Sequence, residues 1–341
     1  MKKLITAIGL TLSFTAAAGF PVDFKGLGMT SDDYRIYETA PNFNHYANVL
    51  GDGVNEFTHM TSTVTVENQI VVRTNNDTLY SLAVVDTRKG ATFTLPDTGE
   101  RYISAIIFDE YHYPYGMIHK PGKHNIEVDT DYAFVLIRTA FDGSQEDIKY
   151  VVEKLQPKMV ITAASEIPYK MPADFADKKP VLDKINLELR AIGAKLESYS
   201  SLYHEKAESK ADPKAEWEGL LATSVAWGII PATESTFLMD DPKLGTKQCY
   251  SATYTVPPYG AFWSITIYDA DGFLFSNSHS IINDRNVKMN QDGTFTVAFG
   301  SAEQCGKSGN RLDTTEGWNI LMRVYQADMD KLAKYELPKI K

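Results

Sequence analysis

Hydrophobic and polar residues alternate in short runs over two long stretches of the chain. Between residues 61 and 138, segments rich in β-branched and aromatic residues are separated by turns with glycine or proline, and this arrangement returns after Pro231. Runs with period two and no helical pattern between them are typical of antiparallel sheets. We therefore predict strands at residues 63–66, 79–85, 91–95, 102–108, 132–139, 248–256, 261–268, 294–299 and 318–325.

The middle of the chain has a helical period instead. Apolar residues from Leu182 to Tyr203 recur at steps of three and four, which predicts one amphipathic helix over residues 181–209. Shorter helices are predicted at 145–155 and 214–226. The apolar stripe of the long helix has two interpretations, packing against a β domain or an interhelical contact between subunits.

These elements predict a mainly β protein with a helical insert, in which two antiparallel β-sandwich or jelly-roll-like domains are linked by an α-helical segment. The expected limits are 19–142 for the N-terminal β domain, 143–230 for the helical segment and 231–341 for the C-terminal β domain.

The N-terminus has the pattern of an export signal. Two lysines precede an uncharged stretch that ends in small residues, including Ala16 and Ala18. This predicts a signal peptide at residues 1–18, cleaved near Ala18, and a periplasmic or secreted protein.

Composition and charge exclude several classes of function. The 341 residues are 43% hydrophobic, enough for folded cores, and the net charge of −10 without a basic cluster argues against nucleic-acid binding. After the signal sequence, no stretch is apolar enough to span a membrane. Cys249 and Cys305 could pair in an oxidising compartment or remain two buried thiols. Without metal-binding spacing or a nucleotide-binding motif, no metal and no cofactor are expected.

The densest run of polar residues is RTNNDTLYS at positions 73–81. Arg73, Asn75, Asn76, Asp77 and Tyr80 lie between two apolar segments, and their carboxamides and carboxylate could recognise hydroxyls or amides through directed hydrogen bonds. The alternative is a structural Asx turn in which Arg73 pairs with Asp77.

Two further clusters follow predicted strands. Asp109, Tyr111 and His112 lie just after 102–108, where aromatic rings beside acids suit a polar organic ligand and a histidine could act as a general base. Asn277 and Arg285 follow the strand at 261–268 and could contribute across the domain boundary.

The residues favour binding or processing of a small polar organic ligand, such as a carbohydrate, in a pocket lined by the Asn-Asn-Asp turn. One alternative is a hydrolase with Asp77, Asp109 and His112 as acid and base. Another is an assembly protein that forms homo-oligomers through the central helix.

Two groups of motifs resemble a known bacterial two-domain family. The run at 73–81, followed by PDT at 96–98 and RY at 101–102, is similar to domain of unknown function 1254. A second group resembles its usual companion, domain of unknown function 1214, and comprises YD at 268–269, GFL at 272–274, Asn277, DR at 284–285 and LMRVY at 321–325. The resemblance implies two β-sandwich-like domains in a mostly secreted or periplasmic protein, with oligomers plausible and no agreed activity.

Overall fold

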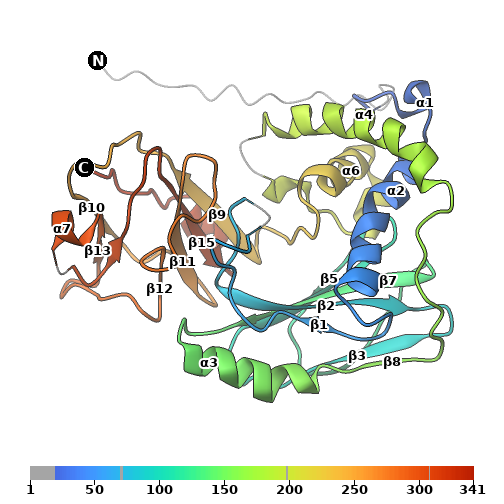
Figure 1. Ribbon diagram of the computed structural model, residues 1–341, viewed down its shortest axis with the longest axis horizontal. Coiled ribbons are helices and arrows are strands. Elements are labelled where there is room, and N and C mark those ends of the chain that lie inside the picture. Colours follow the sequence, from blue (N-terminus) through green and yellow to red (C-terminus); the bar gives the residue numbers. More distant parts are fainter. Residues whose placement is uncertain (1–19, 70–71, 197–198, 307) are drawn as a thin grey trace.

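The computed structural model describes residues 20–69, 72–196, 199–306 and 308–341. The predicted signal peptide at 1–18 lies outside this part of the chain. The strands form two β-sandwiches side by side, and a layer of helices covers one face of the N-terminal sandwich (Figure 1). Most strand pairs are antiparallel, so the predicted fold class, mainly β with helical elements, is confirmed.

The N-terminal sandwich packs a five-stranded antiparallel sheet against a three-stranded one. The larger sheet has the order β1 (Thr58–His59), β2 (Thr78–Asp86), β7 (Tyr132–Ala140), β4 (Ile103–Asp109) and β5 (Pro114–Ile118). The smaller has the order β6 (Gly122–Asn125), β3 (Ala91–Leu95) and β8 (Ile161–Ala163). Apolar side chains from both sheets, including Phe93, Ile107 and Val135, form the core between them.

The other face of the five-stranded sheet is covered by helices drawn from both ends of this half of the chain. They are α1 (Phe24–Leu27), α2 (Ser31–Asn44), η1 (His45–Val49), α4 (Phe175–Gly193), η4 (Ser200–Leu202), α5 (Lys206–Ala211) and α6 (Pro213–Val225). Phe43, Phe134 and Trp227 belong to the core at this face. α3 (Gln145–Tyr150), continued by η2 (Val151–Leu155) and η3 (Gln156–Lys158), packs its apolar side against Leu79 and Phe141.

The C-terminal sandwich is smaller. Its four-stranded sheet has the order β12 (Ile281–Asn283), β11 (Trp263–Tyr268), β15 (Asn319–Tyr325) and β9 (Ser235–Asp240). Its three-stranded sheet has the order β10 (Tyr250–Tyr254), β13 (Phe295–Phe299) and β14 (Arg311–Leu312), with β13 and β14 parallel. Trp263, Phe295 and Trp318 fill the core, and the short helices α7 (Ala302–Cys305) and α8 (Met329–Leu332) lie outside the strands. Cys249 and Cys305 form a disulfide, with Cα atoms 5.0 Å apart.

The predicted helix over 181–209 is wrong in its length. α4 ends at Gly193, where a Cβ atom would lie 2.7 Å from a methyl group of Val225 on α6. The chain then turns, and Tyr203 packs against the sheet rather than along α4. The prediction used only the spacing of apolar residues, and this spacing continues past Gly193 although the chain changes direction there. The first part of the stripe, including Leu189, is buried against other helices of the same chain and not against a β-sheet, so the partner expected for intramolecular packing was wrong.

Two other differences from the predicted elements concern residues before β2. The segment 63–66 forms no strand, because Val64 and Val66 are held by the amide side chains of Asn76 and Asn277 instead of by a neighbouring strand. Helix α2 was not predicted, since its polar composition and internal Pro41 hide its apolar face. In the described part of the chain, no helix is long and apolar enough to cross a membrane.

Candidate functional site

The Asn-Asn-Asp turn lies where the two sandwiches meet. The Asn75 amide donates to the hydroxyls of Tyr80 (3.1 Å) and Tyr325 (2.9 Å), and its oxygen accepts the backbone N–H of Asp77 (2.9 Å). Asn76 makes two hydrogen bonds with the backbone of Val64, at 2.9 and 2.8 Å. Both amide groups are therefore engaged within the protein, and they fix the path of the chain on either side of the turn.

Asp77 and Arg73 extend these contacts into the C-terminal sandwich. The buried Asp77 carboxylate accepts a hydrogen bond from the Ser264 hydroxyl (2.7 Å), and burial raises its pKa despite the opposing charge of Arg323. Arg73 donates to Asn319 (2.8 Å) rather than to Asp77. We call this set of contacts the seam, and it joins Arg73, Asn75 and Asp77 to Asn319, Tyr325, Ser264 and Arg323.

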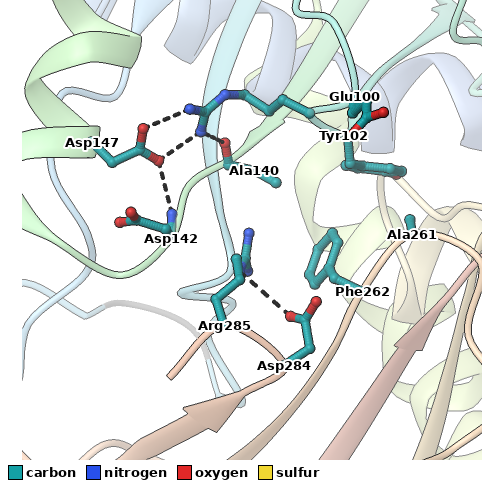
Figure 2. A pocket seen from close by; sticks show the side chains of 10 residues that line it. Glu100, Tyr102, Ala140, Asp142, Asp147, Ala261, Phe262, Asp284 and Arg285 are labelled. Carbon is teal, nitrogen blue, oxygen red and sulfur yellow. Dashed lines mark hydrogen bonds and ion pairs between the residues drawn. The ribbon is translucent and has the colours of Figure 1, made fainter. Parts of the chain in front are cut away.

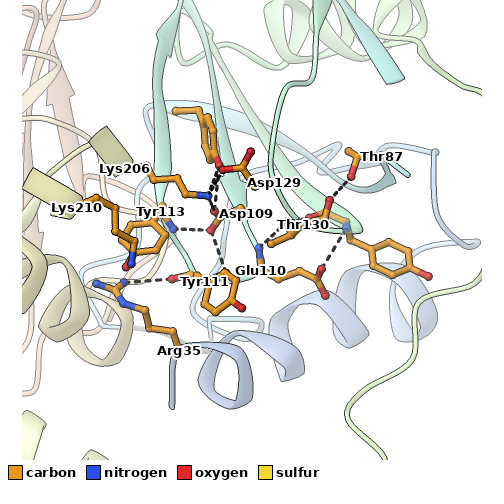
Figure 3. A network of polar contacts seen from close by, with 12 residues as sticks. Arg35, Thr87, Asp109, Glu110, Tyr111, Tyr113, Asp129, Thr130, Lys206 and Lys210 are labelled. Atoms are coloured by element: carbon orange, nitrogen blue, oxygen red, sulfur yellow. Dashed lines mark hydrogen bonds and ion pairs between the residues drawn. The ribbon is translucent and has the colours of Figure 1, made fainter. Parts of the chain in front are cut away.

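Asp109 is a buried anchor for the loop that follows β4. Its Oδ1 accepts the backbone N–H of Tyr111 (3.0 Å), and its Oδ2 accepts from Lys206 (2.9 Å) and the Tyr115 hydroxyl (3.1 Å). Figure 3 shows that Lys206 contacts both Asp109 and Asp129. Its ammonium group donates a hydrogen bond to Asp129 at 2.8 Å. The carboxylate thus ties the loop to α5.

His112 is packed in the core between the sheet and the helices. Its Nε2 accepts the backbone N–H of Gly228 (2.9 Å), and its ring packs in one cluster with the rings of Phe108 and Trp227, at centroid distances of 4.8 and 5.4 Å. Burial lowers the pKa of His112 to about 3, so the ring is neutral at pH 7. Asp77, Asp109 and His112 have separate partners and form no acid–base pair with one another.

Asn277 and Arg285 lie on the C-terminal side of the seam. Asn277 accepts the backbone N–H of Val66 (2.8 Å) and donates to Glu67 (3.1 Å). Arg285 lines a separate interdomain cavity of about 230 Å³, with its guanidinium over the Phe262 ring (4.9 Å) and 3.5 Å from Asp284 (Figure 2). Neither residue lines the larger cavity described next.

A cavity of about 610 Å³ brings together three of the predicted ligand-binding residues, Asn75, Asn76 and Tyr80. Its floor is the helix-covered face of β2 and β7, and its walls are the 59–64 segment, Tyr46 and the turn at Trp227. We call it the Arg138 cavity, after a residue that the sequence analysis did not select. This volume is within the range of small-molecule sites.

Arg138 is the charged residue of this cavity. Its side chain lies on β7 opposite Tyr80 on β2, and its guanidinium lies 5.5 Å from the centre of the Tyr80 ring. Nη2 donates to the Gly228 carbonyl (3.2 Å), whereas Nη1 has no hydrogen-bond partner among the described residues. The signal was present in the sequence, because Arg138 interrupts the apolar run of β7.

Two more buried polar atoms of the lining are unpaired with any described residue. They are the indole Nε1 of Trp227 and the hydroxyl of Thr78. His59, also in the lining, contacts the Ser81 hydroxyl at 2.7 Å, and burial lowers the pKa of its ring. The arrangement can therefore offer several hydrogen-bond donors to a ligand in a chamber of mixed polar and apolar lining.

A metal site would require several ligating side chains close together in the described part of the chain. There, no group of three or more His, Cys, Asp or Glu side chains is placed to hold a metal ion. Glu234 accepts a hydrogen bond from Tyr102 (2.5 Å) and lies 3.0 Å from His119. This cluster connects the two sandwiches, and Glu234 raises the pKa of His119.

Solved structures share this fold. A protein from Vibrio parahaemolyticus, VPA0106, matches with a TM-score of 0.70 and 19% identity, over 91% of this chain and 97% of that chain. An uncharacterised protein from Burkholderia cenocepacia matches with a TM-score of 0.54 and 17% identity, over 90% of this chain and 86% of that chain. No curated protein matches the chain.

Family models match both halves of the chain in the order expected from the motifs. Residues 54–125 match the family described as "Protein of unknown function (DUF1254)", and residues 239–329 match "Protein of unknown function (DUF1214)". The chain therefore carries an N-terminal DUF1254 region and a C-terminal DUF1214 region, in the arrangement that the sequence motifs indicated.

Proposed function

We propose that the protein binds a small polar organic molecule in the Arg138 cavity. The observation that carries this proposal is the cavity itself: about 610 Å³ in volume, it joins Asn75, Asn76 and Tyr80 to the buried Arg138. Ligand sites in proteins are typically concave, mostly apolar chambers with a few fixed polar groups. The Arg138 cavity combines polar and apolar groups, with Met60 and Leu136 among its apolar lining and more polar residues than is usual.

The cavity wall is also held rigidly, which favours binding. The two hydrogen bonds between Asn76 and Val64 fix the segment that closes one side. Asn75 fixes Tyr80 by a hydrogen bond from its amide to the phenol oxygen. In this role the carboxamides shape the site and need not contact the ligand themselves. A preformed wall lowers the entropy that binding must overcome.

We place this activity outside the cytoplasm. The Cys249–Cys305 disulfide supports that location, because structural disulfides persist in oxidising compartments. The predicted signal peptide at 1–18 would deliver the protein there. Cell fractionation of the full-length chain tests the proposal, and recovery of the protein with the cytoplasmic fraction and with two free thiols would argue against it.

A ligand screen tests the binding proposal. Isothermal titration calorimetry with organic acids, sugars, amides and amines should find at least one ligand that binds the wild type. Ser62→Trp places a large ring at an exposed point of the cavity lining and should weaken that binding at least about tenfold, a change of ~1.4 kcal/mol. Ser251→Trp, on the exposed side of β10, is the matched control and should bind as the wild type does. Ligands that bind Ser62→Trp with full affinity would place the site elsewhere.

A further inference from the structure

We propose that the ligand of the Arg138 cavity is a small organic monocarboxylic acid, whose carboxylate is bound by Arg138 and whose apolar body lies along Met60, Leu136 and Trp227. This inference rests on the proposed function and adds the chemical class of the ligand. It is argued from charge, from the kinds of hydrogen-bonding atom that remain available, and from the apolar lining.

The first argument is that Arg138 differs from the other buried arginines. Among the described residues, Arg35, Arg138 and Arg323 are buried. Arg35 pairs with Glu216 at 3.4 Å, and Arg323 makes four hydrogen bonds near the buried Asp77. Arg138 forms no ion pair with a described residue, and its Nη1 is unpaired. A buried cation is stable only when an anion and hydrogen-bond acceptors compensate it, so Arg138 is suited to a ligand that supplies both.

The lining of the cavity has the matching charge. No Asp or Glu belongs to the described residues that line it, and burial lowers the pKa of the His59 ring, which favours its uncharged form. Arg138 therefore contributes a single positive charge to the chamber. One guanidinium matches the planar, singly charged carboxylate, which it can bind through two parallel N–H···O bonds, better than it matches a doubly charged phosphate.

The second argument concerns donors and acceptors. Arg138 Nη1 and Trp227 Nε1 can only donate, and Thr78, two residues from Tyr80 on the same strand, adds a hydroxyl. The amide oxygens of Asn75 and Asn76 each already accept one backbone N–H group. A sugar needs acceptors for its own hydroxyl hydrogens, whereas a carboxylate only accepts. The two unpaired N–H donors therefore match a carboxylate, and the comparison with glucose described below separates an acid from the carbohydrate suggested by the sequence.

These donors lie close together in the fold. Arg138 and Tyr80 are direct cross-strand partners in the β2–β7 pair, and Thr78 pairs with Ala140, two residues further along β7. Side chains at diagonal positions on one face of such a pair are within reach of each other. Trp227 precedes Gly228, whose carbonyl accepts the Arg138 bond. The apolar part of the lining, including Met60 and Leu136, offers a surface for a hydrocarbon or aromatic body.

The test compares matched ligands on matched proteins by isothermal titration calorimetry. The probes are benzoate and hexanoate, their uncharged amides, inorganic phosphate, sulfate and glucose. The wild type should bind the carboxylates about 10- to 100-fold more tightly than the amides, the factor expected for a charge-assisted hydrogen bond. Arg138→Met should remove this preference by weakening only the carboxylates. Arg311→Met, in the C-terminal sandwich, is the control and should keep the preference.

The outcomes separate this inference from the proposed function. Three results would each overturn the inference. The wild type could bind acid and amide with equal affinity, Arg138→Met could bind benzoate as tightly as the wild type does, or the wild type could bind phosphate as tightly as benzoate. Glucose binding that Ser62→Trp removes would overturn it too, while leaving the proposed function standing. If no probe and no member of the wider screen binds in a way that Ser62→Trp weakens, both fail. If Arg138→Met does not fold, Arg138→Lys replaces it. The comparison of acid with amide on the wild type then still tests the inference.

Discussion

Replacing Arg323 by methionine should lower the free energy of unfolding by about 3–5 kcal/mol, the usual effect of removing one member of a buried charged network. The guanidinium is buried on β15 and donates from Nη1 to Thr266 (3.1 Å) and from Nη2 to the Arg73 carbonyl (2.7 Å) and the Tyr268 hydroxyl (2.8 Å). Methionine keeps most of the apolar stem but leaves these acceptors without a donor. It also leaves the buried Asp77 carboxylate without the positive charge of Arg323, which lowers its pKa.

A double-mutant cycle measures the charge part of this effect. Asp77→Leu alone leaves Arg323 without its counter-charge, whereas Asp77→Leu with Arg323→Met removes both charges. The double variant should therefore be less destabilised than the sum of the single variants, by at least about 1 kcal/mol. Urea unfolding followed by far-UV circular dichroism and by tryptophan fluorescence supplies all four free energies. Coincidence of the two signals is required for a two-state analysis.

The control is an exposed ion pair in the same sandwich. Lys331 lies 2.9 Å from Asp328 on the surface, and Lys331→Met should give no measurable change. Two results would refute the view that a buried charge network holds the seam. The losses of unfolding free energy in the two single variants could add up to that of the double variant, or Arg323→Met could be as stable as the wild type.

Three further predictions concern stability. Cys249→Ser with Cys305→Ser should lower the unfolding free energy measured in urea by about 4 kcal/mol, since the disulfide closes a loop with a sequence separation of 56 residues; no change would mean that the loop closure carries no stability. Burial raises the pKa of Glu38 to about 7, so its contribution to stability is present below its unfolded pKa and is lost as the pH rises through 7. Glu38→Gln keeps an acceptor for Asn186 and should raise the unfolding free energy by about 1–2 kcal/mol at pH 8 but not at pH 4; an equal gain at both would contradict the titration. Leu189→Glu should reduce folding without altering the mass of the folded fraction in light scattering, because Leu189 is buried within its own chain; a folded protein of changed mass would favour the assembly interpretation.

Local patterns predicted the β elements well, since a strand buried on one or both faces needs a run of β-branched and aromatic residues. β2, β3, β7 and β13 lie within about a residue of their predicted limits. The helical layer was harder to predict. The apolar period around α4 continued past the point where the chain turns at Gly193, and a turn of this kind depends on close packing with α6 rather than on local sequence.

The candidate site illustrates a different difficulty. Sequence reasoning selected the densest polar residues, and Asn75, Asn76 and Asp109 proved to be densely bonded within the protein. Dense polar runs tend to satisfy themselves, because neighbouring donors and acceptors find each other locally. A group left available for a ligand is more often a single polar residue inside an apolar element. Arg138, the charged residue of the buried strand β7, is of this kind.

The seam and the Arg138 cavity are linked, because contacts of the seam hold a wall of the cavity from outside. Asn75 bonds at once to Tyr80, in the cavity wall, and to Tyr325 on β15, two residues beyond Arg323. The C-terminal sandwich therefore positions a wall of the Arg138 cavity without lining it. Loosening the seam at Arg323 should weaken ligand binding as well as stability, even under conditions where the variant remains folded. Tyr325→Phe, which removes only the hydroxyl that accepts the Asn75 bond, isolates this effect. If it bound the ligand as tightly as the wild type, the C-terminal sandwich would have no part in positioning the site.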